Sequence, residues 1–222
     1  MAKIKPEFIE IDRESMWDWY SLVIKLPKIA GGIPSDPKLV EAWQRAKWPK
    51  GRDEQIGSAV TQTLAELGTE APGWNTFKRD REGHFCLEAR QVKAMLKEAA
   101  EVTRAMLLAQ QKDAVPFFLR ARLAEKVHVE GDLLPFIPWK TEPDESPEKP
   151  IHVMTARGPR DALKKVDVLW DVEVHCRLKV LADGEFTEPL LKTLLNFACD
   201  NGLGADRSQG MGTFDYGLRR VQ

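Results

Sequence analysis

Val168 to Leu181 has the sequence VLWDVEVHCRLKVL, the cleanest alternation of apolar and polar residues in the chain. Successive side chains of a β-strand point to opposite faces of its sheet, so this pattern predicts a half-buried strand. One face carries Val168, Trp170, Val172, Val174, Cys176, Leu178 and Val180, and the other carries Asp171, Glu173, His175, Arg177 and Lys179.

The residues downstream predict a helix, a glycine-rich loop and a last strand. The helix is expected from Thr187 to Asn201, because apolar residues recur there every three or four positions. Its buried stripe comprises Leu190, Leu191, Leu194, Leu195 and Ala198. Gly202 follows at the position where a left-handed C-terminal cap is favoured. Thr213 to Val221 predicts the strand that closes the chain.

Three elements are expected upstream. Trp17 to Leu26 predicts the first strand, whose buried face comprises Tyr20, Leu22, Ile24 and Leu26. Ala89 to Gln111 has the strongest helical pattern, and Pro116 ends it. The stripe of this helix comprises Val92, Met95, Leu96, Ala99, Val102, Met106 and Leu107. Phe117 to Val129 predicts another strand.

Two insertions separate these elements. The first, residues 28–85, begins with a break at Pro27 to Pro34 and ends with a loop from Thr69 to Gly83. Between them, short helices are expected from Ser35 or Asp36 through Trp43 and from Asp53 to Leu67. The second insertion, residues 131–166, contains the proline-rich run PFIPWKTEPDESPEKP. We expect this run to form a mobile loop or a protruding hairpin rather than part of the core.

Without the insertions, the order of elements is strand, helix, strand, strand, helix, strand. This is the order of a ferredoxin-like, or RRM-like, βαββαβ core in the α+β class. Such a core has an antiparallel sheet with both helices on one face, and RNA-recognition domains bind RNA on the open face. We therefore expect one domain over residues 1–222, with residues 28–85 inserted after the first strand and residues 131–166 inserted between the second and third strands.

The composition narrows the classes of function. The chain has 33 basic and 34 acidic residues, which counts against indiscriminate duplex binding but not against a local basic groove. Cys86, Cys176 and Cys199 are odd in number and far apart, so we expect neither a disulfide framework nor a cysteine-rich zinc site. No apolar run approaches the roughly 18 residues of a membrane-spanning helix. We expect a cytoplasmic protein with no membrane partner, metal or cofactor.

The glycine-rich loop is the most specific motif in the chain. It consists of Gly202, Gly204, Gly210 and Gly212, with Arg207 and Ser208 between them. Glycine lets the backbone adopt a positive φ and lets a phosphate approach main-chain N–H groups. Arg207 can pair with a phosphate, and Ser208 can donate one hydrogen bond. A simple connector needs fewer glycines, so we predict that these six residues contact nucleic acid.

The run GLGADRSQGMGTF, residues 202–214, resembles the glycine-rich loop of the CRISPR-associated RAMP superfamily, whose members are repeat-associated and ferredoxin-like. Two further segments, Gly31 to Pro34 and Thr155 to Leu163, resemble small phage-borne relatives with a single ferredoxin-like domain. The resemblance is topological over most of the chain. It implies an origin in a bacterial cell or a phage-infected host.

The resemblance implies two alternative roles. One branch of the superfamily coats single-stranded guide RNA as a helical filament, using the open sheet face and a thumb between the second and third strands. The other branch cleaves guide precursors without metal, commonly with a histidine as acid or base. Residues 131–166 fall at the thumb position, which favours the coating branch.

We therefore expect a non-enzymatic binder of single-stranded RNA or DNA. It would assemble along the strand as a homo-oligomer or serve as a subunit of a ribonucleoprotein. A metal-independent endoribonuclease and a structural or adaptor protein of a phage or mobile element are the alternatives.

Residues outside the loop add candidates for these roles. Arg157, Arg160 and Lys164 belong to the densest basic patch, which predicts contact with the nucleic-acid backbone, although most charge runs are solvated surface. Trp139 is placed to stack on a base, at about 1–3 kcal/mol per base. His152 and His84 are the candidate catalytic residues of the endoribonuclease alternative. None of the four histidines stands in a metal-ligand spacing.

Overall fold

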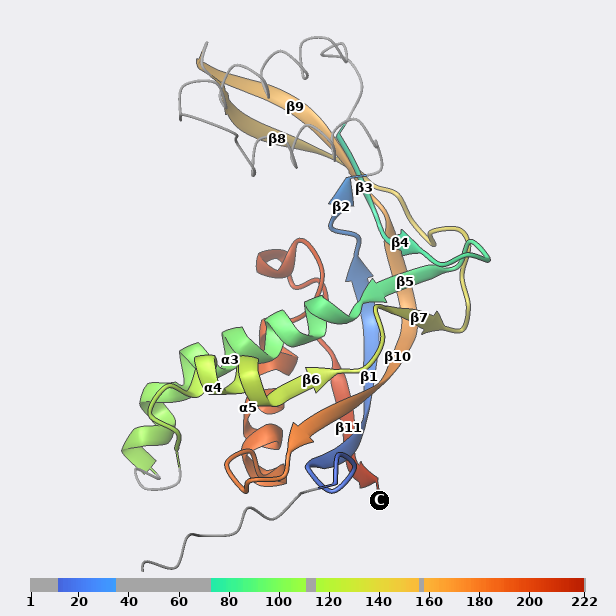
Figure 1. Ribbon diagram of the computed structural model, residues 1–222. Helices are drawn as coiled ribbons and strands as arrows, with labels where there is room; N and C mark the ends of the chain where they lie inside the picture. The colour runs from blue at the N-terminus through green and yellow to red at the C-terminus, as the bar shows by residue number, and fades with distance from the viewer. Residues whose placement is uncertain (1–11, 35–72, 111–114, 156–157, 222) are drawn as a thin grey trace, which may run out of the picture.

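The computed structural model describes residues 12–34, 73–110, 115–155 and 158–221. In these residues the chain is an α+β protein with three helices and a mostly antiparallel main sheet (Figure 1). No helix in this part of the chain is long and apolar enough to span a bilayer.

Two long strands form the centre of the main sheet. Strand β1, Trp17–Ala30, pairs antiparallel with β10, Val168–Leu181, from Trp17 opposite Leu181 to Ala30 opposite Val168. The other edge of β1 pairs with β11, Asp215–Val221. Beyond β10 lie β6 (Val127–Val129), β7 (Leu133–Ile137), β5 (Phe85–Glu88) and β4 (Lys78–Arg79).

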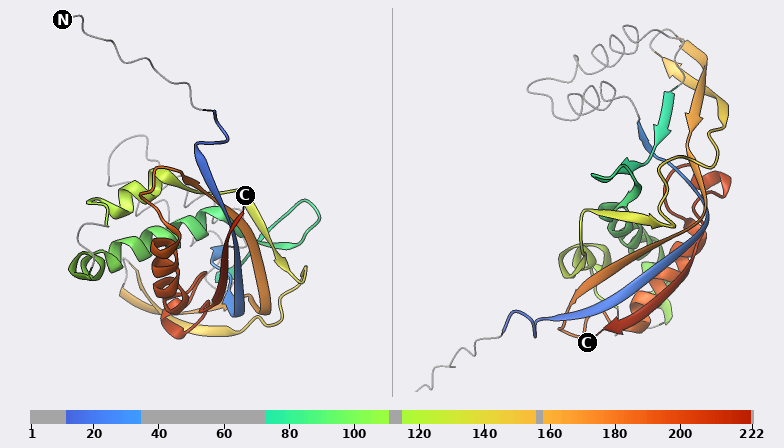
Figure 2. Two further views of the ribbon diagram at one scale, coloured as in Figure 1. Left: turned by 90° about the horizontal axis from the view of Figure 1, so that it is seen from below. Right: turned by 90° about the vertical axis from the view of Figure 1, so that its right-hand side faces the viewer.

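Three helices cover one face of this sheet: α3 (Ala89–Gln110), α4 (Leu119–Lys126) and α5 (Glu188–Asn201). Viewed from below, they lie to one side of the strands (Figure 2, left). Their apolar stripes pack on the inward side chains of β1 and β10 to form one large core. Its fully buried members include Leu22, Ile24, Val174, Leu191 and Leu194.

A second, smaller sheet projects from the main one (Figure 1, top). Its order is β2-β3-β9-β8, with β2 at Ile33–Pro34, β3 at Gly73–Thr76, β8 at Glu148–Thr155 and β9 at Gly158–Val166. The buried carboxylate of Asp167 anchors its base, because Oδ1 accepts hydrogen bonds from Trp74 Nε1 at 2.9 Å and Ser146 Oγ at 2.6 Å.

The strongest sequence patterns predicted their elements closely. Strand β10 has the predicted bounds and buries alternate residues from Val172 to Val180 as expected, but Trp170, expected on the buried face, is only half-buried and Leu169 is fully buried instead. Helix α5 begins one residue later than predicted and buries the whole expected stripe. Helix α3 is also confirmed, but Val102 and Met106 are exposed rather than part of its buried stripe. Gly202 has the expected positive φ of 78°, yet its ψ of 173° is extended and not left-handed helical.

The prediction of a strand over Phe117 to Val129 is wrong for most of its length. Residues Leu119–Lys126 form α4, and only Val127–Val129 form a strand. Leu119 and Leu123 lie one helical turn apart, and both are fully buried. Phe117 and Phe118, whose aromatic side chains favour strands, remain exposed instead.

The insertions also differ from their predictions. Strand β1 runs through Pro27 to Ala30, so the expected break begins only at Gly31, where a Cβ would lie 2.6 Å from the Thr76 carbonyl oxygen. The expected loop from Thr69 to Gly83 contains β3 and β4. The proline-rich run contributes to the core after all, because Phe136 of β7 is fully buried. The two expected short helices lie outside the described residues.

Candidate nucleic-acid interface

The face of the main sheet opposite the helices carries two tryptophans beneath two cationic side chains. Trp17 and Trp19 alternate on β1 with the buried residues of that strand, and Trp19 is the register partner of Lys179 on β10. The Lys179 Nζ lies 4.3 Å from the Trp17 ring centroid, and the Arg177 guanidinium carbon lies 4.4 Å from the Trp19 ring centroid. We call these four residues the sheet-face cluster.

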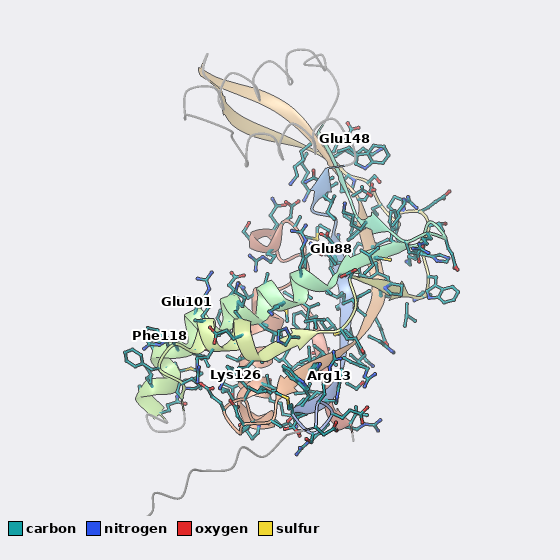
Figure 3. The ribbon with its side chains drawn as sticks, in the orientation of Figure 1. Arg13, Glu88, Glu101, Phe118, Lys126 and Glu148 are labelled. Carbon is teal, nitrogen blue, oxygen red and sulfur yellow. The ribbon has the colours of Figure 1, made fainter. Side chains whose placement is uncertain are left out.

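A groove of about 1030 Å³ opens at the sheet-face cluster. All four cluster residues line it, as does Arg13, which lies at the lower end of β1 (Figure 3). Aromatic rings at such a groove provide a surface for unpaired bases once the cations that lie over them turn to the phosphates, for which they supply charge.

The charges of the cluster are only partly neutralised. Arg177 forms an ion pair with Glu130, with 3.4 Å between Nη1 and Oε2. Within the described residues, Lys179 has no carboxylate within ion-pair distance. The cluster therefore retains positive charge although the chain as a whole is nearly neutral.

The glycine-rich loop lies at the opposite end of β1 from the sheet-face cluster. The Ala205 N–H donates to the Ala30 carbonyl at 3.0 Å, and the Gly212 N–H donates to the Lys28 carbonyl at 2.9 Å. A Cβ on Gly204 would lie 2.7 Å from the Ala30 carbonyl oxygen. Glycine is therefore needed here for packing of the loop against β1, independently of any ligand.

Side chains tie the loop to two other elements. Arg207 donates from Nη1 to Glu98 Oε2 on α3 at 2.8 Å. This hydrogen bond lowers the pKa of Glu98, outweighing the opposite effect of burial. The Asp206 carboxylate accepts from Lys164 Nζ at 3.1 Å, and the Lys149 Nζ lies 3.7 Å from it. The loop thus connects α3 with the base of the β8–β9 hairpin.

The predicted site residues are consequently distributed over several places. Lys164 lies with the glycine-rich loop, where Arg207 and Ser208 are exposed. Trp139 lies elsewhere, with its ring centroid 5.1 Å from that of His84. Arg157 and the side chains of Arg160 and His152 lie outside the described part of the structure.

His84 forms a hydrogen-bonded pair with Asp80. The Nδ1 of His84 lies 3.1 Å from Asp80 Oδ2, and the Asp80 Oδ1 accepts from the backbone N–H groups of His84 and Glu82 at 2.9 Å each. Burial raises the pKa of Asp80, but these hydrogen bonds outweigh it and lower the pKa overall. Asp80 is therefore a charged carboxylate, and its hydrogen bond holds the His84 imidazole in one orientation.

Sequence reasoning missed the sheet-face cluster, although a signal for it was present. In the first predicted strand, Trp17 and Trp19 lie on the face that does not carry the apolar residues Tyr20 and Leu22. Arg177 and Lys179 were predicted on the outward face of the strand that pairs with it. What the sequence lacked was the register, which sets Trp19 opposite Lys179.

No group of three histidine, cysteine, aspartate or glutamate residues within the described residues is arranged to hold a metal ion. Burial raises the pKa of Cys176 to about 12, so this thiol stays protonated at neutral pH.

No protein-family model and no curated protein matches this sequence. Among solved structures, the chain is similar to one chain of the Type III-B Cmr-beta complex bound to cognate target RNA, determined by cryo-electron microscopy. The two are 11% identical with a TM-score of 0.45, and the match covers 94% of this chain. It covers 62% of the other chain, so this protein spans less than two thirds of its length.

Proposed function

We propose that this protein binds single-stranded nucleic acid on the helix-free face of its main sheet. The observation that carries the proposal is the sheet-face cluster, in which Lys179 and Arg177 lie over Trp17 and Trp19 beside an open groove. Stacking on aromatic rings requires bases whose faces are free, which single strands offer and duplexes do not.

The topology supports a ferredoxin-like core as the scaffold of this site. In the main sheet β1 lies between β11 and β10, and β6 and β7 lie on the far side of β10. Helix α3 lies in sequence between β1 and β6, and α5 lies between β10 and β11. This is the element order expected of a RAMP-like domain, in which the β8–β9 hairpin, inside residues 131–166, would be the thumb, whereas β7 at the start of that range joins the main sheet.

The glycine-rich loop and Lys164 form a second proposed contact. Arg207 and Ser208 are exposed there, and Lys164 adds a cation from the hairpin base. The loop packs on Lys28 and Ala30, near the end of β1. A nucleic-acid strand that lies along β1 would therefore reach both the loop and Trp19. The distance between these two contacts is about 30 Å at the usual β-strand rise of about 3.3 Å per residue.

Variants of the tryptophans test the proposal directly. We expect Trp19→Ala to weaken binding of a short oligouridylate by about 1–3 kcal/mol, the usual contribution of one stacked base, and Trp19→Phe to restore most of it. Phe118→Ala is the matched control, because Phe118 is an exposed aromatic at the far end of the helices (Figure 3). Fluorescence anisotropy with RNA and DNA probes measures the affinities; equal losses in Trp19→Ala and Phe118→Ala would refute the assignment.

Asp80, His84 and Trp139 favour metal-independent RNA cleavage as a second candidate function. A histidine oriented by a carboxylate can act as a general base on a 2′-hydroxyl, and Trp139, 68% exposed, is placed to stack on the adjacent base.

Incubating labelled RNA with the wild type and His84→Gln in EDTA distinguishes the two functions. Products that vanish in His84→Gln would support cleavage, whereas intact RNA in both reactions leaves binding alone. A protein that neither binds nor cleaves would be a structural or adaptor protein.

A further inference from the structure

A group of basic side chains from three elements meets beside the sheet-face cluster. Lys93 of α3 places its Nζ 3.5 Å from Nδ1 of His128 on β6. His128 is the register partner of Lys179 on β10. The ring of Trp17 joins the two, because its centroid lies 5.6 Å from that of His128 and 4.3 Å from the Lys179 Nζ.

The contacts of His128 define its tautomer. Nε2 lies 3.0 Å from the carbonyl oxygen of Glu125, which can only accept, so Nε2 carries the proton of the neutral ring. The lone pair of Nδ1 then faces the ammonium group of Lys93, which donates to it. If Nδ1 were protonated, two cations would face each other across this gap. An anion placed between them would remove that repulsion.

The surroundings of His128 supply no such anion within the described residues. The Glu125 carboxylate forms an ion pair with Arg122 at 3.9 Å, and only the Glu125 carbonyl faces the ring. The other described side chains related to His128 by a contact or by strand register are those of Lys93, Lys179 and Trp17, and none of them is acidic.

The pKa values reflect this excess of positive charge. Burial, followed by the charge of Lys93 and a smaller effect of Lys179, lowers the pKa of His128 despite its bond to the Glu125 carbonyl. Burial and the charge of Lys97, one turn along α3, likewise lower the pKa of Lys93. The ring of His128 is therefore neutral near pH 7 in the free protein.

We propose that Lys93, His128 and Lys179 form a subsite for one phosphate group of the bound strand, and that His128 takes up a proton from solvent as the phosphate binds. A phosphate oxygen that bridges Lys93 Nζ and His128 Nδ1 from one side accepts a hydrogen bond from each, because the 3.5 Å between the two nitrogens leaves no room on the line that joins them. No covalent bond forms or breaks. The subsite rests on the proposed nucleic-acid binding, and either an internal diester or a terminal monoester supplies the required oxyanion.

Proton uptake makes the affinity depend on pH. We expect wild-type affinity for oligouridylate to rise as the pH falls from about 8 to about 5.5, by up to about tenfold per pH unit for one proton. His128→Gln should match the wild type at about pH 8 and lose most of this rise. His175→Gln is the control, since His175 Nε2 lies 3.1 Å from a carboxylate oxygen of Glu173 and outside the subsite. Wild-type pH dependence in His128→Gln would overturn the subsite.

Two probes identify the phosphate. Oligouridylates with a 5′-phosphate and with a 5′-hydroxyl are compared over the same pH range. A steeper rise for the 5′-phosphate supports a subsite for the end of the strand, and an equal rise supports one for an internal phosphate.

Sulfate tests the subsite without nucleic acid. We expect NMR titration in sodium sulfate, against sodium chloride of equal ionic strength, to show a raised pKa for His128. Failure of oligouridylate to bind at any pH would refute the proposed function, whereas binding with no response of His128 to sulfate or to strand would refute only the subsite.

Discussion

Gly204 and Gly210 have nearly the same positive φ, 81° and 79°, but different surroundings. A Cβ on Gly204 would press on the carbonyl of Ala30, whereas one on Gly210 would meet nothing within 4 Å. Gly204 is thus required by close packing and by its backbone angle, and Gly210 by its angle alone.

We therefore expect Gly204→Ala to destabilise the fold more than Gly210→Ala. The left-handed backbone costs both variants about 1–2 kcal/mol, and overpacking adds about 1–3 kcal/mol at Gly204. Urea unfolding of the pair measures the difference, and the nearly equal φ values make Gly210→Ala a matched control. Equal free energies of unfolding would mean that the loop shifts away from β1 without cost.

Arg207 is held by Glu98, so a phosphate that uses Arg207 has to compete with this carboxylate. We expect Glu98→Gln to strengthen binding of single strands and Arg207→Ala to weaken it. Because the pKa of Glu98 is lowered, its stabilising ion pair is present above the ordinary glutamate pKa and is lost as the pH falls through the lowered value. Solvent screening keeps this contribution below about 1 kcal/mol.

Binding titrations of the two variants at neutral pH test this competition. Unchanged affinity in both would mean that the glycine-rich loop makes no contact with the nucleic acid and has only its structural contacts to β1, α3 and the β8–β9 hairpin.

At the scale of elements, α4 shows how a short helix is stabilised by its neighbours. Its apolar contacts come mainly from Leu119 and Leu123, which are fully buried, and its main packing partner is α3. Isolated helices of this length are unstable in water, so packing on α3 has to stabilise it.

Leu123→Ala should accordingly cost about 2–5 kcal/mol, because Leu123 is fully buried and its removal leaves a cavity. Phe118→Ala, at the residue directly before α4 and 65% exposed, is expected to change stability by less than about 0.5 kcal/mol. Thermal unfolding followed by circular dichroism compares them. A small effect of Leu123→Ala would contradict the close packing of α4 on α3.

The same contrast explains which elements the sequence predicted. Strand β10 and helix α5 have long apolar periods, which predicted their bounds to within a residue. Helix α4 has only one pair of buried leucines, and two phenylalanines that favour a strand precede it. The segment is helical because it packs on α3, which the local sequence does not indicate, so the prediction of a strand was wrong.

The candidate site was predictable only where one segment contains all of its residues. The glycine-rich loop was identified as a motif, yet its contact with Glu98 joins residues 109 positions apart and left no local signal. The sheet-face cluster depends in the same way on the pairing of β1 with β10.

At the scale of the whole molecule, the two proposed contacts lie at opposite ends of β1. A strand long enough to touch both should bind more tightly than one that reaches either alone, because the second contact becomes intramolecular. We expect log affinity to fall with log salt by about 0.7 for each phosphate contacted, so longer oligonucleotides should show steeper slopes. Equal slopes for short and long strands would exclude a path along β1.

Cooperative binding is the remaining prediction at this scale. If the protein coats a strand as a filament, electron micrographs with long RNA should show continuous arrays, and titrations should be steeper than for single sites. Isolated particles at saturating protein would limit the protein to single-site binding.

The position of β1 in the sheet also determines when the domain can fold during synthesis. Trp17 pairs with Leu181, and Trp19 with Val221, so β1 requires partners that lie far downstream in the chain and are made much later. On the ribosome, the apolar face of β1 therefore stays uncovered until β10 and β11 have emerged, and such late pairings slow folding. During that interval the nascent chain exposes Leu22 and Ile24, which makes it a client for chaperones that bind apolar segments.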